Sequence, residues 1–173
     1  YIGYADAGVD DDIFESYQPE IELLEQRLFK YHVDFEKLKV DDSIAAICAS
    51  RPTNPTGNVL TNEEIKKLDQ LARANNIPLI IDNAYGVPFP NIIFEDVEPF
   101  WNENTILCKS LSKLGLPGLR CGIIIANEAI TKALTNLNGI ISLAPVSLGP
   151  AIAHRMIENS DLLKLSKQVI RPY

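Results

Sequence analysis

The chain has 173 residues, with 16 Lys and Arg against 23 Asp and Glu, so its net charge is −7. This excess of negative charge argues against non-specific binding to nucleic acid or to an anionic membrane, because both favour a basic surface. Hydrophobic residues make up 46% and charged residues 23%, which is typical of an ordered globular chain. The length predicts a single domain with a sizeable core.

The three cysteines, Cys48, Cys108 and Cys121, lie far apart in the sequence and form no closely spaced pair. An odd, scattered set argues against a disulfide framework and favours a reducing compartment, so we expect a cytoplasmic protein with buried thiols. Only His32 and His154 accompany them, and a structural zinc site is therefore not expected.

Neither end of the chain resembles a natural terminus. The first residue is Tyr rather than Met, and we find no basic leader, no signal-like apolar run and no segment long enough to span a bilayer. We therefore expect the chain to be a piece of a larger protein.

The first part of the chain, residues 6–42, is acidic and has little pattern, and we interpret residues 10–12 as a solvated acidic loop rather than a metal site. A short apolar run at 43–50 then predicts a buried strand, followed by a loop at 51–58. Thr61 and Glu64 form a capping box, and the apolar spacing after them predicts a helix that ends at residues 75–76. Further strands are expected at 77–82, 105–108 and 121–126.

Helices are expected at about 127–137, 149–159 and 161–170. The strands show no internal alternation, which is typical of strands buried on both faces. The sequence therefore predicts the α/β class, a three-layer sandwich in which helices flank a mostly parallel sheet.

Polar residues follow three of the expected strands. Asn54 lies in the loop after the first, Asp82 and Tyr85 follow the second, and a segment rich in serine and glycine follows the third. Ligands in open α/β sheets bind at the carboxyl ends of strands, so we expect these side chains to meet at one edge.

Each residue has an ordinary alternative when it is considered alone. Asp82 could cap a helix, Lys113 could be a solvated surface lysine, and Arg120 could form a surface ion pair. Together they fit pyridoxal phosphate: the lysine can form a Schiff base, the arginine can bind a phosphate, and the carboxylate can hold a pyridinium nitrogen protonated. Hydroxyl donors to the phosphate are available from Ser110 and Ser112.

These motifs resemble the fold-type I aminotransferases of the aspartate aminotransferase superfamily. The resemblance rests on Asn-Pro-Thr-Gly at 54–57, Asp82-x-x-Tyr85, and Ser-x-Ser-Lys at 110–113 followed by Arg120, and it extends over essentially the whole chain. It implies that Lys113 forms the aldimine with the cofactor and then shuttles the proton. It also implies that Asp82 pairs with the pyridine nitrogen, and that Tyr85 and Asn54 bind the ring oxygen, with Asn54 also contacting the substrate carboxylate. The phosphate would be bound by Ser110, Ser112 and Arg120, and Tyr1 would stack on the cofactor ring.

The resemblance extends over longer stretches at 50–59, 81–90 and 110–118, and it implies an aliphatic amino acid such as valine and a 2-oxo acid such as pyruvate as substrates, in a reaction of amino-acid biosynthesis that yields alanine. The resemblance also implies a homodimer, and a chain that forms most of the cofactor-binding large domain without its N-terminal segment and C-terminal small domain. The remaining arginines lie in no motif that resembles the family's carboxylate-binding arginine; they are Arg27, Arg51, Arg73, Arg155 and Arg171.

Two alternatives remain open. A lyase, decarboxylase or synthase would use the same pocket, because the choice of reaction depends on which Cα bond lies perpendicular to the cofactor ring. A non-catalytic domain that senses the cofactor for a transcription regulator is disfavoured, because the chain has no basic helix-turn-helix pattern and retains Lys113 and Asp82.

Overall fold

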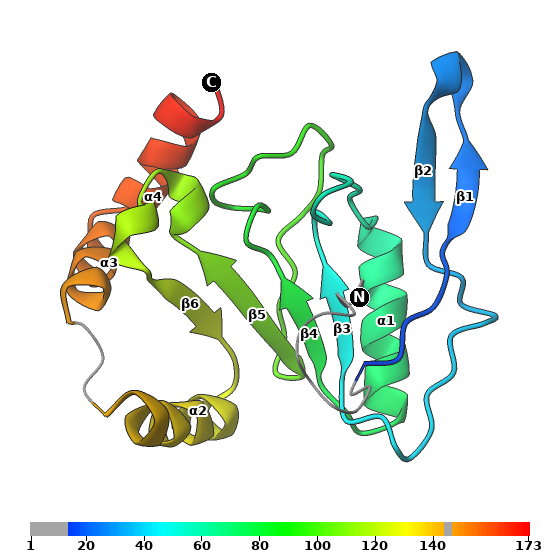
Figure 1. Cartoon of the computed structure of the whole chain (residues 1–173), viewed down its shortest axis with the longest axis horizontal. Coiled ribbons are helices and arrows are strands. Elements are labelled where there is room, and N and C mark those ends of the chain that lie inside the picture. The colour runs from blue at the N-terminus through cyan, green and yellow to red at the C-terminus, as the bar shows by residue number, and fades with distance from the viewer. Residues whose placement is uncertain (1–13, 144–146) are drawn as a thin grey trace.

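The computed structural model describes residues 14–143 and 147–173, so the predictions for Tyr1 and for residues 10–12 lie outside the described part of the chain. Its centre is a four-stranded sheet in the order β3-β4-β5-β6 (Figure 1). β3 (Ile47–Ser50), β4 (Leu79–Asp82) and β5 (Thr105–Ser110) are parallel, and β6 (Gly122–Ile125) is antiparallel to β5. The predicted α/β class with a mostly parallel sheet is confirmed.

Helix α1 (Asn62–Ala74) covers one face of this sheet. It begins with the predicted capping box, in which Thr61 accepts from the Glu64 backbone amide and the Glu64 carboxylate accepts from the Thr61 amide. Ile65, Leu68 and Ala72 of α1 pack on Ile47, Ala49, Leu79, Ile81 and Leu107 of the strands. Burial of each Leu or Ile side chain contributes about 1.5–3 kcal/mol, so this cluster fixes α1 on the sheet.

The prediction that the strands are buried on both faces is wrong for the described residues. Burial alternates along β3 and β5, and the residues that point away from α1, among them Cys48, Ile106 and Cys108, are only half-buried. On β6, Ile124 and Ile125 are exposed, and Ile124 lines a groove of about 530 Å³ between this strand and helix α2. The three cysteines are free thiols of intermediate exposure rather than buried ones.

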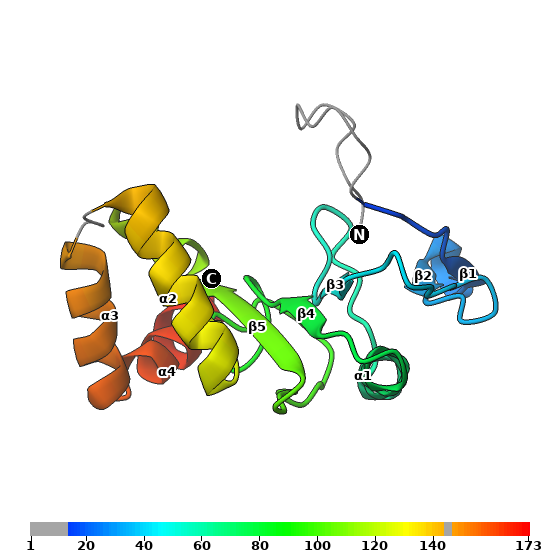
Figure 2. The same cartoon turned by 90° about the horizontal axis from the view of Figure 1, so that it is seen from below.

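The helices after β6 gather at the opposite end of the sheet from α1 (Figure 2). They are α2 (Glu128–Ser142), α3 (Leu148–Glu158) and α4 (Asp161–Leu165), which continues as a π-helical turn, Ser166–Ile170. The prediction ended α2 near residue 137, but the helix continues through Gly139, which costs a helix interior only about 1 kcal/mol relative to alanine. A second core forms here from Leu111, Leu114, Ala153 and Leu162.

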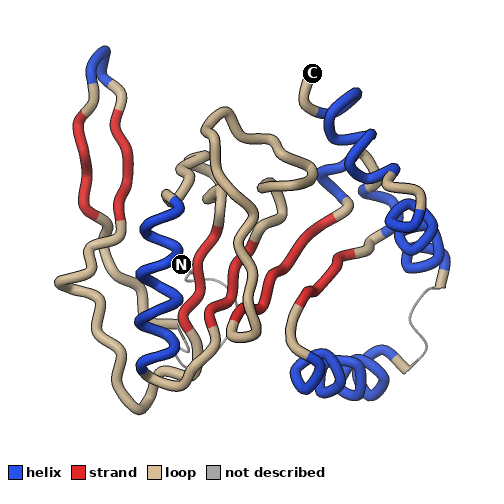
Figure 3. Tube along the Cα trace, turned by 180° about the vertical axis from the view of Figure 1, so that it is seen from behind, coloured by secondary structure: helices blue, strands red, loops and turns tan. Residues whose placement is uncertain are grey.

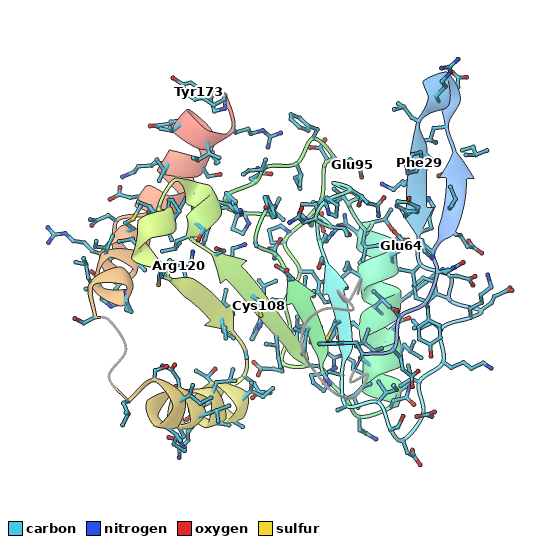
Figure 4. The ribbon with its side chains drawn as sticks, in the orientation of Figure 1. Phe29, Glu64, Glu95, Cys108, Arg120 and Tyr173 are labelled. Atoms are coloured by element: carbon cyan, nitrogen blue, oxygen red, sulfur yellow. The ribbon has the colours of Figure 1, made fainter. Side chains whose placement is uncertain are left out.

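The sequence analysis did not predict the hairpin formed by β1 (Glu20–Leu23) and β2 (Phe29–His32), which projects beside α1 (Figure 3). Hydrogen bonds rather than apolar burial attach it. The Asn58 side chain accepts from the Tyr31 amide at 3.1 Å and donates to the Tyr31 carbonyl at 3.0 Å. Glu64 lies at the end of α1 that faces the hairpin and accepts from the Val33 amide at 2.9 Å (Figure 4). Among the helices of the described residues, none combines the length and the hydrophobicity that a membrane-spanning segment requires.

Candidate active site

The carboxyl ends of β3, β4 and β5 lie side by side at one edge of the sheet. Ser50 pairs with Asp82, and Asp82 pairs with Cys108, so Asp82 lies centrally at this edge with its carboxylate exposed. One carboxylate oxygen accepts from the Ala84 amide at 3.0 Å, which holds the side chain at the end of its strand. Burial raises the pKa of the Cys108 thiol, and the negative charge of Asp82 raises it further. This edge is therefore anionic at Asp82 and holds a protonated thiol beside it.

Lys113 and Tyr85 come together although they lie 28 positions apart in the sequence. The Lys113 ammonium lies 5.1 Å from the centroid of the Tyr85 ring, which is a cation–π geometry. Lys113 belongs to the short 3-10 turn Ser112–Leu114, and the fully buried Leu111 and Leu114 hold this turn on the second core. Lys113 itself is exposed, so a fixed backbone presents a free amine.

The predicted phosphate-binding residues lie where β5 and β6 meet. Ser110 pairs with Gly122, and its hydroxyl accepts from the Ser112 amide at 3.2 Å. Arg120 follows a second 3-10 turn, Pro117–Leu119, in a left-handed backbone conformation with φ of 45° (Figure 4). Among the described residues, neither its guanidinium nor the Ser112 hydroxyl has a hydrogen-bond or ion-pair partner, so both are available to a ligand.

Asn54 lies at the exposed tip of the loop after β3. Hydrogen bonds from the Thr53 amide to the Asn58 carbonyl (2.8 Å) and from the Gly57 amide to the Thr53 carbonyl (2.7 Å) close the base of this loop. The loop begins at the same edge as Asp82, because the Arg51 amide donates to the Asp82 carbonyl at 2.8 Å. Within the described residues, the Asn54 side chain makes no hydrogen bond with Tyr85 or Lys113, so the expectation that Asn54 and Tyr85 both bind the ring oxygen stays a prediction.

Sequence reasoning missed a layer of buried polar residues behind this edge. Arg51 donates to the Leu60 carbonyl (2.6 Å), the Asn62 side chain (2.6 Å) and the Glu98 carbonyl (3.2 Å). Lys109 is only 4% exposed, donates to the Val87 carbonyl at 2.9 Å, and burial lowers its pKa to about 8. A charged residue at a core-facing position of β5 was the available signal, but the prediction ended that strand at Cys108.

The side chains at this edge fit pyridoxal phosphate chemically. An exposed primary amine on a fixed turn suits the aldehyde, and a carboxylate at a strand end suits the pyridine nitrogen. A phenol beside the amine suits the ring oxygen, and hydroxyls with a guanidinium that no described residue pairs suit the phosphate. In order, these groups belong to Lys113, Asp82, Tyr85, Ser110, Ser112 and Arg120. Tyr1, predicted to stack on the ring, is not part of the described structure.

Comparisons with known proteins agree with this chemistry. The chain is 64% identical over all 173 residues to valine–pyruvate aminotransferase of Escherichia coli K12, and it spans 42% of the length of that protein. The crystal structure of valine–pyruvate aminotransferase from Salmonella typhimurium LT2 superimposes with a TM-score of 0.88 at 63% identity, covering 94% of this chain and 42% of that one. A histidinol-phosphate aminotransferase of Thermoanaerobacter is 36% identical over 140 residues, which are 79% of this chain and 37% of the relative.

The fold alone extends further, to the aspartate aminotransferase of Thermus thermophilus, with a TM-score of 0.67 at 19% identity over 77% of this chain and 35% of that one. The family model "aminotransferase class I and II" matches residues 9–171. This match covers nearly the whole sequence, and the chain therefore belongs to the class I and II aminotransferase family.

Proposed function

We propose that the chain forms most of the cofactor-binding large domain of an aminotransferase that exchanges an amino group between an aliphatic amino acid such as valine and a 2-oxo acid such as pyruvate. The contact between the Lys113 amine and the ring of Tyr85, which lies in the turn that follows Asp82, is the observation on which this proposal rests. The 64% identity to the E. coli valine–pyruvate aminotransferase supports the substrate pair.

The cofactor of this family is pyridoxal phosphate, which supplies a sink for the electrons left at the substrate Cα when its proton is removed. Asp82 would keep the pyridine nitrogen protonated, because a nearby carboxylate favours the positive form of that nitrogen. Tyr85 would donate a hydrogen bond to the ring oxygen, and Asn54 would join it there and at the substrate carboxylate. Lys113 would move the proton between the substrate Cα and the cofactor C4′.

Ser110, Ser112 and Arg120 would bind the cofactor phosphate. Arg120 has the planar donor geometry that suits a phosphate and no competing carboxylate among the described residues. Ser110 already accepts from the Ser112 amide, and this leaves its own hydroxyl proton free for donation.

We also propose that the longer protein is a cytoplasmic homodimer. The three free, half-buried cysteines support a reducing compartment. The homodimer is an expectation from the family resemblance. Arg120 is assigned to the cofactor phosphate and does not provide a contact for the substrate carboxylate. We propose that a neighbouring subunit and segments outside this chain complete the pocket and supply that contact.

The decisive assay follows alanine formation from valine and pyruvate by the full-length protein with pyridoxal phosphate. Transamination requires both substrates, and turnover of valine with no 2-oxo acid present would instead identify a lyase or decarboxylase. Leucine and isoleucine should be tested in parallel, because one methylene changes discrimination by only about 1–3 kcal/mol.

Borohydride reduction of the cofactor-loaded protein, followed by peptide mapping, should label Lys113. Lys109 is the matched control, because it lies four residues earlier and burial lowers its pKa to about 8, yet it is enclosed. A label on Lys109 with none on Lys113 would refute the assignment.

A further inference from the structure

The segment that connects Asp82 to Val87 is closed by the side chain of Asn83. This side chain is 5% exposed, and its amide nitrogen donates to the Val87 carbonyl at 2.6 Å. The Asn83 backbone amide donates to the Cys108 carbonyl at 2.8 Å and so continues the pairing of β4 with β5. The Gly86 amide returns to the Asn83 carbonyl at 3.2 Å. Asn83 thus joins the end of the sheet to the far side of the turn.

Gly86 shows how closely the turn is packed on Asn83. A Cβ at this position would lie 1.6 Å from the side-chain oxygen of Asn83 and 2.5 Å from the Arg51 carbonyl oxygen. The Asn83 side chain therefore occupies the space that a side chain at position 86 would need. Glycine is required here by close approach of the neighbouring atoms.

The Val87 carbonyl accepts a second hydrogen bond, from the Lys109 ammonium at 2.9 Å, and that ammonium also lies 4.7 Å from the centroid of the Phe89 ring. Both donors to this carbonyl, Asn83 and Lys109, are buried. Asn83 differs from Lys109 because it belongs to the turn itself, one residue after Asp82 and two before Tyr85. A change at Asn83 therefore alters the backbone that presents both of these side chains.

The backbone around Tyr85 is fixed on its other side as well. The Tyr85 carbonyl accepts from the Ile92 amide at 2.9 Å, and the Gly86 carbonyl accepts from the Asn91 amide at 3.0 Å. The backbone of Tyr85 is therefore held by Asn91 and Ile92 on one side and by Asn83 on the other. The position of the Tyr85 ring under Lys113 depends on how the Asn83 side chain closes the turn. Groups that bind a cofactor need such support to within about 0.5 Å.

We propose that Asn83 is a positioning residue for the cofactor: by closing residues 82–87 on the Val87 carbonyl, it places the Asp82 carboxylate and the Tyr85 phenol where the ring nitrogen and ring oxygen bind. This inference rests on the proposed function. It concerns a residue that touches neither the cofactor nor the substrate in the proposed mechanism.

The test uses Asn83→Asp and Asn83→Ala in the full-length protein, with Lys109→Met as the matched control. Asn83→Asp keeps the size of the side chain but removes the donor to Val87, and its carboxylate can pair with Lys109, so this variant should fold where Asn83→Ala fails. We expect the dissociation constant for pyridoxal phosphate, from absorbance titration, to rise about ten-fold in Asn83→Asp, the size expected for one lost buried hydrogen bond. Lys109→Met should change it less than about two-fold.

A double-mutant cycle with Tyr85→Phe distinguishes positioning from general destabilisation. If Asn83 acts through the Tyr85 phenol, the loss caused by Asn83→Asp shrinks in the Tyr85→Phe background. A loss that stays undiminished there, or wild-type affinity in both Asn83 variants, would overturn the inference. An equal loss in Lys109→Met would assign the role to the ammonium and also overturn it.

Hydrogen exchange in the cofactor-free protein tests the same geometry independently of function. The Gly86 and Ile92 amides should exchange about ten-fold faster in Asn83→Asp than in the wild type, because local opening becomes easier by one hydrogen bond. Unchanged exchange contradicts the role of Asn83 in closing the turn. A wild-type protein that does not bind pyridoxal phosphate would refute the proposed function, and the exchange result would still decide whether Asn83 closes the turn.

Discussion

Glu64 connects α1 to the hairpin. Its replacement by glutamine changes only one carboxylate oxygen to an amide nitrogen, yet it should lower the free energy of unfolding substantially. One carboxylate oxygen accepts from the Val33 amide at 2.9 Å and lies 3.2 Å from the His32 Nδ1 atom. The other accepts from the Thr61 amide at 2.8 Å and from the Thr61 hydroxyl at 2.9 Å. The amide of glutamine has only one acceptor oxygen, so either the helix cap or the hairpin attachment must lose its acceptor.

The Glu64 side chain is only 9% exposed, so water does not replace the lost contacts. Loss of a helix cap costs about 0.5–2 kcal/mol, and a buried donor without an acceptor costs about 1–3 kcal/mol. Glu64→Gln loses parts of both, and we therefore expect the free energy of unfolding to fall by about 2–4 kcal/mol.

The assay is urea denaturation at pH 7, with Glu63→Gln as the control. Glu63 is the preceding residue, its side chain is 75% exposed, and it pairs only with Lys66 among the described residues. The control should lie within about 0.5 kcal/mol of the wild type, as surface substitutions usually do. A Glu64→Gln protein as stable as this control would refute the reasoning from the shared carboxylate.

The effect of Glu64 should also depend on pH. Burial by itself raises the pKa of the Glu64 carboxyl, but hydrogen bonds from the Thr61 and Val33 amides outweigh burial, and the pKa lies below its ordinary value. A lowered folded-state pKa gives stability that is present above the unfolded pKa and lost as the pH falls through the folded one. The difference between wild type and Glu64→Gln should accordingly shrink in acid, and a difference that grows on acidification would contradict this sign.

Four further predictions follow from the same structure. A hydrogen bond to Glu22 raises the pKa of His32 against the opposing effect of burial. The loss of stability in His32→Gln should therefore be greatest below about pH 6.5 and should vanish as the pH rises through the pKa of His32 in the folded state. Urea denaturation at a series of pH values measures this loss. Burial lowers the pKa of Lys109 to about 8. The free energy of unfolding of the wild type should therefore rise relative to that of Lys109→Met between about pH 8 and 10, by at most about 1.4 kcal/mol per pH unit. A difference between the two proteins that does not change with pH would contradict this. Lys113→Ala should abolish transamination, and Asp82→Asn should lower it by orders of magnitude, while circular dichroism shows both folded; near-normal turnover in either would remove that residue's role. The 173-residue chain purified alone should bind pyridoxal phosphate weakly or not at all and form no measurable alanine, and turnover like that of an intact aminotransferase would refute this.

The sequence was sufficient to predict those features that depend on neighbouring residues. The capping box at Thr61 and Glu64 is a local pattern, and the structure reproduces it. The strand end at Asp82 was also predictable, because a polar residue after an apolar run indicates where a buried strand reaches the sheet edge, whereas β5 runs to Ser110, two residues beyond its predicted end at Cys108. The meeting of these strand ends at one edge followed from parallel pairing.

The features that sequence reasoning missed depend on contacts between distant segments. The hairpin is held by Asn58 and Glu64, and neither lies near it in the sequence. Asn83 looks like an ordinary turn residue until the structure shows it filling the space beside Gly86. Burial of the second sheet face was overestimated because an unbroken apolar run does not specify which neighbour covers it, and β6 faces a groove.

The placement of charge explains how an acidic chain can offer a site for an anionic cofactor. The net charge of −7 arises from the whole chain, and solvent ions screen exposed charges beyond about 8 Å at physiological salt. The potential at the sheet edge is therefore set by nearby groups. The exposed Lys113 and Arg120 lie at that edge. No carboxylate hydrogen-bonds to Lys113 or Arg120 within the described residues, so the charge of these two side chains remains available to a phosphate, while Asp82 stays at the same edge for the pyridine nitrogen.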